Sequence, residues 1–300
     1  MVQQLPADGP MCIDVPLVHR LVAAQFPQWA ELPIRPVEAA GRDNVIFRLG
    51  TELSVRLPRR ELGARHLANE HRWLPFLSPH LPLPVPAPLG QGLPSEGYPW
   101  CWTVTRWLPG DVSAFGSGLD EIQMADELAR FITALRAVNP AEGPASDLRG
   151  APLVERDPGV RAAIAARPGD WDRQAMTAVW ESALTVPSWV PPAVWTHGDL
   201  HPGNLLTIDG RLTAVIDFGL LGVGDPAIDV LPAWTVLSRP TRDRFRRALQ
   251  VDEATWARTR GRALDFGLMC VATAPRGSLV GNIGRRTIDQ ILTDDQGWIG

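Results

Sequence analysis

The chain has 300 residues, of which 45% are hydrophobic and 21% charged, with a net charge of -4. This composition excludes a disordered or fibrous protein and supplies enough apolar material for a large core. The slightly acidic balance argues against a nucleic-acid partner, which normally requires a basic surface. All 29 basic residues counted as Lys+Arg are arginine, so a mechanism that strictly needs a lysine ammonium is excluded.

The cysteines and the N-terminus predict a cytoplasmic protein. Cys12, Cys101 and Cys270 are widely spaced and form no Cys-x-x-Cys pair, so we expect three buried, reduced thiols instead of a disulfide framework or a zinc site. The first residues lack the basic and apolar regions of a secretory signal. Prolines interrupt the long uncharged run over 81–95, so neither a membrane span nor a membrane partner is expected. The oligomeric state stays open.

The first third of the chain predicts a helix followed by short strands. Apolar residues recur at helical spacing behind Asp14, a residue type that favours an N-cap, and two strand-like runs meet at Gly50-Thr51 as in a hairpin. In chain order the predicted elements are a helix from Asp14 to about Phe26, strands over 44–49 and 52–57, a helix over 62–77, a proline-rich connector over 79–88 and a strand over 100–108.

Beyond Pro109-Gly110 the pattern changes to long amphipathic helices, and we place a domain boundary there. The sequence thus predicts an α+β protein with two lobes. Residues 1–108 form a small mixed β-sheet lobe with a hinge at about 105–110, and residues 109–300 form a larger, mostly helical lobe. The elements expected in the larger lobe are helices over 119–138, 160–166 and 173–184, short strands over 194–196, 205–208 and 212–216, and helices over 226–237, 241–249, 253–272 and 282–292.

The strand cluster of the larger lobe carries the most informative motif, His197-Gly-Asp199-Leu-His-Pro-Gly-Asn204, followed by Ile216-Asp217-Phe-Gly219. Metal-dependent phosphoryl transfer needs one carboxylate that accepts the proton of an attacking hydroxyl. It also needs an amide oxygen and a second carboxylate that hold Mg²⁺ against the phosphates. An Asp, an Asn five residues later and a second Asp after a hairpin supply these groups. Each alone is also a common turn residue.

This pair of motifs resembles the aminoglycoside phosphotransferase family, whose members are related to the protein kinases. The resemblance covers nearly the whole chain and implies a protein-kinase-like fold. It implies a kinase that transfers the γ-phosphate of ATP or GTP to a hydroxyl of a small molecule, with Mg²⁺ as cofactor. Residue by residue, it implies Asp199 as catalytic base, Asn204 and Asp217 as Mg²⁺ ligands, and His197 and Asp229 as supports of the catalytic loop.

The resemblance also implies a nucleotide site in the small lobe. Glu70 lies on the same helical side as several leucines, where an unpaired carboxylate is costly, so an inward partner such as Arg56 is expected. The residues that match the family's nucleotide positions are Asp43 and Asn44 in the loop over the phosphates, Arg56 on the next strand, Glu70 as its ion-pair partner, and Trp107 and Leu108 at the hinge.

Arg56 departs from the family pattern, which usually has lysine at this position. Arginine keeps the charge and can bind phosphate through two nitrogens, but its fork is longer and planar. Either Arg56 replaces the lysine directly, or it marks weakened nucleotide use and a pseudokinase-like binding protein without turnover.

The acceptor is less defined than the reaction. An aminoglycoside-like antibiotic is the first expectation, and a polycation of this kind needs an acidic pocket, for which Asp225 and Asp265 are candidates together with other aspartates of the helical lobe. The twelve tryptophans would also suit stacking on sugar or macrolide faces. A kinase for a macrolide, or for a metabolite such as choline, homoserine or a sugar amine, stays open.

Overall fold

The computed structural model describes residues 12–37, 43–112, 118–146, 151–166, 171–190 and 192–295. The chain divides into two compact units, one formed by Met1–Ser78 and Pro86–Leu108 and the other by Pro79–Val85 and Pro109–Gly300. The proline-rich segment Pro79–Val85 thus belongs to the second unit, where the carbonyl of Pro84 accepts a hydrogen bond from the Val215 amide at 3.1 Å. Among the described helices, none is both long and apolar enough to cross a membrane.

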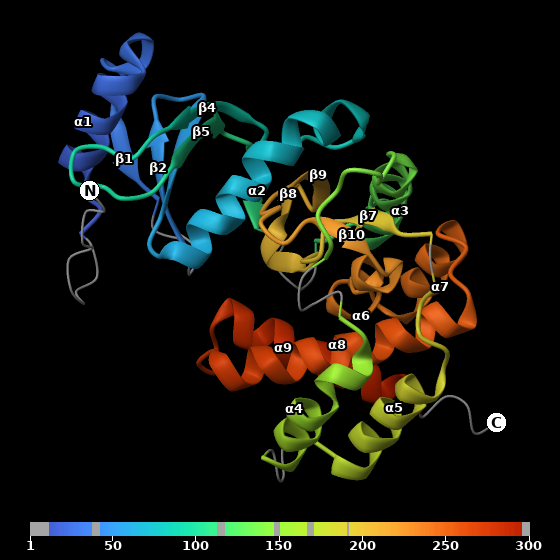
Figure 1. Ribbon diagram of the computed structural model, residues 1–300. Helices are drawn as coiled ribbons and strands as arrows, with labels where there is room; N and C mark the ends of the chain where they lie inside the picture. Colours follow the sequence, from blue (N-terminus) through green and yellow to red (C-terminus); the bar gives the residue numbers. More distant parts are fainter. Residues whose placement is uncertain are drawn as a thin grey trace. The chain divides into compact units, whose positions relative to one another are not determined.

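The first unit is built on a five-stranded antiparallel sheet with the order β1-β2-β3-β5-β4 (Figure 1). The predicted hairpin is confirmed, since Leu49 pairs with Leu53 across a turn in which Gly50 has a φ of 62°. Strands β1 and β4 were not predicted, because both are short edge strands that contain proline, and β4 also contains glycine. The strands are β1 Ile34–Pro36, β2 Asn44–Leu49, β3 Leu53–Pro58, β4 Pro88–Gly92 and β5 Trp102–Arg106.

Two helices, α1 (Val15–Gln25) and α2 (Glu61–Leu77), complete this unit together with the short 3-10 helix η1 (Pro27–Trp29). The predicted cap of α1 is confirmed, because the Asp14 carboxylate accepts a hydrogen bond from the Leu17 amide at 2.9 Å. The apolar face of α1 joins the inner side chains of the sheet in one core. The core includes Leu17, Val18, Leu21 and Val22 from α1, and Phe47, Leu49, Val55 and Trp102 from the sheet.

The second unit is mostly helical and holds two small sheets, as the larger lobe was predicted to do. Strands β7 (Val194–Thr196) and β10 (Gly222–Gly224) pair antiparallel, and three further strands form a sheet with the order β6-β8-β9. The remaining elements are β6 Asp111–Val112, β8 Leu205–Ile208, β9 Arg211–Val215, α3 Glu121–Ala137, α4 Leu153–Ala165, α5 Arg173–Thr185, α6 Pro232–Thr235, α7 Arg239–Ala248, α8 Glu253–Thr273, α9 Leu279–Asp295, and the 3-10 helices η2 Ser78–His80, η3 Pro202–Asn204 and η4 Pro226–Val230. An antiparallel-sheet unit and a helical unit confirm the predicted α+β fold class.

Two details of the second unit differ from prediction. The expected helix over 226–237 is interrupted: η4 ends at Val230, and α6 begins only at Pro232, a residue that cannot donate an amide hydrogen bond. Helix α4 begins at Leu153, earlier than expected, and contains Pro158 within its first two turns.

The cysteine prediction is partly wrong, because Cys270 is buried but Cys12 is exposed and Cys101 is half-buried; all three are free thiols.

Gly92 makes room for the largest side chain of the small core. It pairs with Trp102 across β4 and β5, and a Cβ at Gly92 would lie 1.9 Å from Cε2 of the fully buried Trp102 indole. We therefore expect Gly92→Ala to lower the free energy of unfolding by about 1–3 kcal/mol, as overpacking does. Chemical denaturation of the purified protein measures this change.

Gly159→Ala is the matched control, because a Cβ there meets no atom within 4 Å and the residue lies inside α4. This control should be neutral or should stabilise the protein by up to about 1 kcal/mol, since alanine is the better helix former. Equal stability of the two variants would contradict the close packing of Gly92 on Trp102.

Candidate functional site

The segment that follows β7 is a loop with a fixed backbone path. Gly198 has a φ of 81°, and a Cβ there would lie 2.5 Å from the Leu220 carbonyl oxygen, so only glycine fits without strain. After Leu200, which is fully buried, the chain enters η3, and Asn204 is its last residue. The loop therefore brings the side chain of Asn204 back to the backbone of Asp199.

Asp229 holds this loop by its backbone. Its fully buried carboxylate accepts hydrogen bonds from the amides of His197 at 2.7 Å and Gly198 at 2.9 Å. Burial raises the pKa of Asp229 to about 6, although the two amides and the cation of Arg136 act in the opposite direction. The carboxyl is thus mainly ionised at neutral pH, which is the form that accepts both amide hydrogens.

The ring of His197 links the loop to the segment that carries Asp217. The amide of Asp199 donates to Nδ1 of His197 at 3.2 Å, so the hydrogen-bond network assigns the proton to Nε2, which donates to the Ile216 carbonyl at 3.1 Å. The same ring lies 4.4 Å from the ring of Phe218, centroid to centroid. His197 is fully buried, and both of its ring nitrogens take part in hydrogen bonds within the protein.

Asn204 is oriented by Asp199. Its side-chain Nδ2 donates to the backbone carbonyl of Asp199 at 2.9 Å. The backbone carbonyl of Asn204 accepts a hydrogen bond from the Ile216 amide at 3.0 Å. Because the amide nitrogen is used inside the loop, the side-chain oxygen is the atom available to a cation. The orientation of the amide thus matches the role that a metal-binding asparagine requires.

Asp217 is exposed and adopts a left-handed backbone conformation, with a φ of 64°. The next residue, Phe218, is fully buried and also contacts Phe131 at a ring distance of 6.3 Å. A non-glycine residue in this conformation is uncommon and indicates a functional constraint when the surrounding structure enforces it. Here the buried Phe218 fixes the turn from which Asp217 projects.

The donor set fits Mg²⁺. This ion binds proteins through one or two carboxylates and completes its shell with water and phosphate oxygens. The amide oxygen of Asn204 and the carboxylate of Asp217 are hard oxygen ligands of this kind. Among the described residues, no cluster of three or more His, Cys, Asp or Glu side chains is positioned for a metal, so a zinc-type cage is not found in that part of the chain.

In the first unit, Arg56 on β3 and Glu70 on α2 form a buried bidentate ion pair. Nη1 of Arg56 donates to Oε2 of Glu70 at 2.5 Å, and Nη2 donates to Oε1 at 3.2 Å. Both side chains are buried, with side-chain exposures of 10% and 4%. The structure therefore confirms Arg56 as the partner of Glu70. The planar guanidinium suits this two-point, side-by-side geometry.

His71, next to Glu70, lies in the electrostatic field of the same Arg56 guanidinium. Burial and the neighbouring Arg56 guanidinium lower the pKa of His71 to about 4. Its Nε2 is buried and has no hydrogen-bond partner among the described residues. His71 thus stays neutral at physiological pH and adds no second positive charge beside the Arg56–Glu70 pair.

The other nucleotide candidates lie on the same unit but differ in their surroundings. Asp43 pairs with Arg60 at the start of α2, with Nε of Arg60 donating at 2.8 Å, so its carboxylate is already engaged. Asn44 begins β2, and its buried Oδ1 lacks a hydrogen-bond partner within the described ranges. Residues 41 and 42 of the predicted phosphate loop lie outside the described residues.

The predicted hinge residues end the first unit. The amide of Trp107 donates to the Glu52 carbonyl at 2.8 Å, and the guanidinium carbon of Arg48 lies 4.1 Å from the centre of the Trp107 ring. Leu108 is the last residue of this unit. The backbone here is therefore anchored to the β2–β3 turn directly before the chain passes into the second unit.

The two candidate acceptor residues are both paired with arginines. Asp225 is buried between Arg258 and Arg262, with its Oδ2 3.0 Å from Nε of Arg258 and 3.2 Å from Nη2 of Arg262. Asp265 forms a two-point ion pair with Arg156 at 2.9 and 3.2 Å. Neither carboxylate leaves an uncompensated negative charge for a polycation, which argues against both as aminoglycoside contacts.

Three further residues lie around the loop, and two of them, Phe266 and Arg136, were not predicted. His201 caps η3 through its Nδ1, and its Nε2 lies 3.6 Å from Oδ1 of Asp199. The ring of Phe266 on α8 lies 5.5 Å from that of His201, and Arg136 on α3 donates to the Pro226 carbonyl at 2.8 Å. His201 belongs to the motif itself. Phe266 and Arg136 lie far from the motif in sequence, so no local pattern could identify them.

The chain is similar in sequence to known proteins. The sequence model of the phosphotransferase enzyme family matches residues 34–264. An aminoglycoside 3'-phosphotransferase of Escherichia coli is 31% identical over 145 residues, which are 45% of this chain and 52% of that protein. The chain thus spans about half the length of this curated relative.

Solved structures show the same fold at low sequence identity. The GDP and kanamycin complex of APH(2")-IIia has a TM-score of 0.69 and 18% identity, and the match covers 94% of this chain and 99% of that chain. The macrolide 2'-phosphotransferase MphH from Brachybacterium faecium has a TM-score of 0.60 and 23% identity, with 93% and 97% covered. These two likenesses establish the architecture, and the family match establishes the kinship.

The buried surroundings of His71 make stability depend on pH. Its pKa of about 4 in the folded protein lies below the value of about 6.5 expected in the unfolded chain. The unfolded state therefore binds a proton first, and the contribution of His71 to the free energy of unfolding should fall as the pH falls from about 6.5 to about 4. The raised pKa of Asp229 acts in the opposite direction over the same range, so the difference between parent and variant is the quantity to compare. His71→Gln should remove this part of the pH dependence.

Urea denaturation of parent and variant across this pH range measures the difference, with His19→Gln on the exposed side of α1 as the matched control. Parallel curves for the parent and His71→Gln would show that the Arg56 cation and burial do not act on His71.

Proposed function

Because the chain belongs to the phosphotransferase enzyme family, we propose that it transfers the γ-phosphate of ATP or GTP to a hydroxyl of a small molecule. The observation that carries this proposal is the arrangement of Asp199 and Asn204 on one loop whose backbone is fixed by Asp229. Such a loop presents a carboxylate and an amide oxygen together, as phosphoryl transfer requires. Asp217, projecting from its own constrained turn, supplies the second carboxylate.

Asp199 acts as the catalytic base in this proposal. Its carboxylate is partly exposed, with 13% of the side chain accessible, so it can reach an acceptor hydroxyl and take its proton as the oxygen attacks phosphorus. The two hydrogen bonds at its backbone, from its amide to His197 and from Asn204 to its carbonyl, hold the residue in place. Little reorganisation is then needed when the acceptor binds.

Asn204 and Asp217 would hold Mg²⁺ through oxygen atoms. When bound, the ion neutralises the charge of the phosphate oxygens and aligns them for transfer. Asp229 and His197 are positioning residues, because they contact the loop backbone and the adjoining segment but no reacting atom. Their role is to hold the side chains of Asp199, Asn204 and Asp217 in fixed positions.

Nucleotide binding is assigned to the first unit. Arg56, oriented by Glu70, presents a cation for the phosphates, and the backbone at Trp107 and Leu108 provides the contact for the base. Asn44 is a candidate donor in the loop over the phosphates, and Asp43 organises the start of α2 through Arg60. The bidentate Arg56–Glu70 pair supports direct replacement of the usual lysine and weighs against the pseudokinase-like alternative.

An aminoglycoside is our first proposed acceptor, because the curated relative is an aminoglycoside phosphotransferase. A macrolide is the second, and one observation favours it: the carboxylates of Asp225 and Asp265 are neutralised by arginines. A weakly charged acceptor does not need an acidic pocket. Choline, homoserine and a sugar amine remain further candidate acceptors to be tested in the same panel.

The three free thiols agree with a cytoplasmic location, which stays a prediction.

Asp199→Asn should abolish most of the turnover. An amide cannot accept the proton of the acceptor hydroxyl, so kcat should fall by roughly 10²–10⁴-fold while the protein stays folded. Phosphate transfer from ATP and GTP, with Mg²⁺, to a panel of aminoglycosides, macrolides and small amino alcohols measures the loss. Transfer to no member by the parent would overturn the proposal, and equal rates for parent and variant would remove Asp199 from the base role.

Arg56 variants test the nucleotide site. Arg56→Lys keeps a cation opposite Glu70 and should retain activity within about tenfold, whereas Arg56→Ala leaves a buried carboxylate unpaired and should cost about 3–5 kcal/mol of stability. At a temperature where the alanine variant is folded, its nucleotide KM should rise, or its kcat should fall. Glu70→Gln is the matched change on the partner. Parental values of both constants in Arg56→Ala would exclude Arg56 from the site.

A further inference from the structure

His201 lies on the loop after β7, and the proposed function gives it no role. Its side chain is 16% exposed, and Nε2 of its ring lies 3.6 Å from Oδ1 of Asp199, whose side chain is 13% exposed. The ring therefore stands beside the carboxylate that is proposed as the catalytic base. The contacts that hold the ring decide which of its atoms faces that carboxylate.

The hydrogen bonds of the ring determine where its proton lies. The backbone amide of Gly203 donates to Nδ1 of His201 at 3.0 Å, and an amide N–H can only donate, so Nδ1 is the acceptor nitrogen of a neutral imidazole. The network thus assigns the proton to Nε2. Nδ2 of Asn204 lies 3.4 Å from the same Nε2, but it is itself a donor and is directed to the Asp199 carbonyl at 2.9 Å. Nε2 is therefore a donor, and the carboxylate oxygen 3.6 Å away is an acceptor.

The lack of a side chain at Gly203 lets the ring lie in this position. A Cβ there would lie 2.7 Å from Cε1 and 3.0 Å from Nδ1 of His201, and the three nearest atoms all belong to that ring. The φ of Gly203 lies outside the left-handed region, so its backbone conformation is open to other residues. The glycine is therefore required by the position of the ring and not by the backbone.

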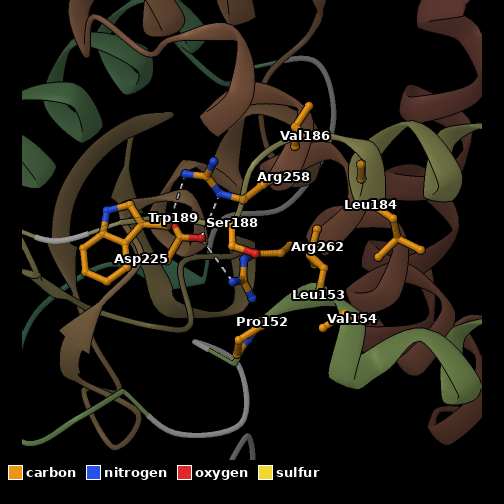
Figure 2. A pocket seen from close by; sticks show the side chains of 11 residues that line it. Pro152, Leu153, Val154, Leu184, Val186, Ser188, Trp189, Asp225, Arg258 and Arg262 are labelled. Atoms are coloured by element: carbon orange, nitrogen blue, oxygen red, sulfur yellow. Dashed lines mark hydrogen bonds and ion pairs between the residues drawn. The ribbon is translucent and has the colours of Figure 1, made fainter.

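Helix α8 supports the ring through Phe266. The two rings lie 5.5 Å apart, centroid to centroid, and Phe266 is buried. Arg258, Arg262 and Phe266 follow one another at four-residue steps, so they share one face of the helix. Figure 2 shows the two arginines on Asp225, which caps η4. This face of α8 is thus anchored by buried ion pairs, and Phe266 is a fixed contact for His201.

A general base needs one carboxylate oxygen directed at the hydroxyl that it deprotonates. Hydrogen bonds at its amide and its carbonyl fix the backbone of Asp199, but they do not set the rotation of the carboxyl group about the Cβ–Cγ bond, which is broad for aspartate. A donor beside Oδ1 does so, because it keeps Oδ1 toward the ring and leaves Oδ2 for the acceptor. Such hydrogen bonds are often long in the free enzyme and shorten when the substrate binds.

We propose that His201 is a positioning residue for phosphoryl transfer, whose Nε2–H holds Oδ1 of Asp199 so that Oδ2 faces the acceptor hydroxyl. The hydroxyl proton passes to Oδ2 as the new oxygen–phosphorus bond forms and the bond to the nucleoside diphosphate breaks. The ring keeps its own proton throughout. This role rests on the proposed function, because His201 acts only through Asp199 as the base.

Two substitutions separate the two nitrogens of the ring. His201→Asn keeps an acceptor near the position of Nδ1 but has no atom at the position of Nε2, whereas His201→Gln does the reverse. We expect His201→Asn to lower kcat by at least about tenfold and His201→Gln to keep it within about threefold, since only the first loses a hydrogen bond to a charged group. The nucleotide KM should stay within about twofold of the parental value in both.

The order of the two variants should reverse for stability. Asparagine is a good N-cap, so His201→Asn should keep the parental melting temperature, whereas His201→Gln loses the cap of η3 and should melt about 1–3 °C lower. A ring that only caps η3 would give the same order of variants in both measurements. Steady-state kinetics and thermal unfolding of the same preparations therefore separate the two roles.

Gly203→Ala moves the ring without changing its chemistry. The added Cβ must displace His201, so kcat should fall by at least about threefold in the parental background. In the His201→Asn background the same change should cost less than about twofold, because changes that act through one group do not add. Equal losses in the two backgrounds would contradict a role of Gly203 through the ring.

A measurement without turnover keeps this proposal distinct from the proposed function. In the full chain labelled with 15N-histidine, the NMR signals of the His201 ring are identified by their loss in His201→Asn. They should show the proton on Nε2, and Asp199→Asn should shift the Nε2 signal because it removes the neighbouring charge. Asp209→Asn, in the exposed turn between β8 and β9, is the matched control and should leave this signal unchanged.

Three results would overturn the proposal: parental kcat in His201→Asn, a kcat in His201→Gln no higher than in His201→Asn, or a ring signal that Asp199→Asn leaves unchanged. If the parent transfers phosphate to no acceptor, the proposed function fails by itself, and the NMR result alone decides whether the ring and the carboxylate interact. A loss of kcat in His201→Asn and Gly203→Ala but not in His201→Gln, together with the shifted signal, would support it.

Discussion

The carboxylate of Asp229 accepts the amide hydrogens of His197 and Gly198 in the interior of the helical unit, and the site depends on this contact. A loop cannot satisfy its own buried amides as a helix or a sheet does, so a buried acceptor must be supplied from elsewhere in the chain. Asp229 supplies it from η4, at an energetic cost visible in its raised pKa. With the loop backbone held, Asn204 can orient on the Asp199 carbonyl, and His197 can reach Ile216.

In this lysine-free chain, arginine supplies the cations of the buried ion pairs that the structure describes. Its planar fork pairs with Glu70 through two nitrogens in the small unit, and two such forks enclose Asp225 in the helical unit. A guanidinium is less strongly hydrated than an ammonium and offers several directed donors, so it is the more suitable cation for burial. The pair at Arg56 joins β3 to α2, whereas the two arginines around Asp225 hold a buried carboxylate from α8.

The predictable part of the site was local in sequence. Asp199 and Asn204 lie five residues apart within one motif. The Glu70 partner was predictable as well, because a carboxylate on an apolar helical face requires a counter-charge. The acidic roles expected for Asp225 and Asp265 could not be judged in this way. Their arginine partners are distant in sequence: Arg258 and Arg262 lie 33 and 37 residues after Asp225, and Arg156 lies 109 residues before Asp265.

The sequence alone determined the α+β class and the long amphipathic helices, because periodicity depends on neighbouring residues. It also contains the motif that we propose for catalysis, whose residues lie close together along the chain. The tertiary structure decided which charges are compensated, which thiol is exposed, where the edge strands β1 and β4 pair, and that helix 226–237 breaks at Pro232. Those outcomes depend on contacts between distant segments, whose energies local propensity does not contain. Asp225 is the clearest case, since an acid that the sequence offered as a contact for a polycation is paired with two buried arginines in the fold.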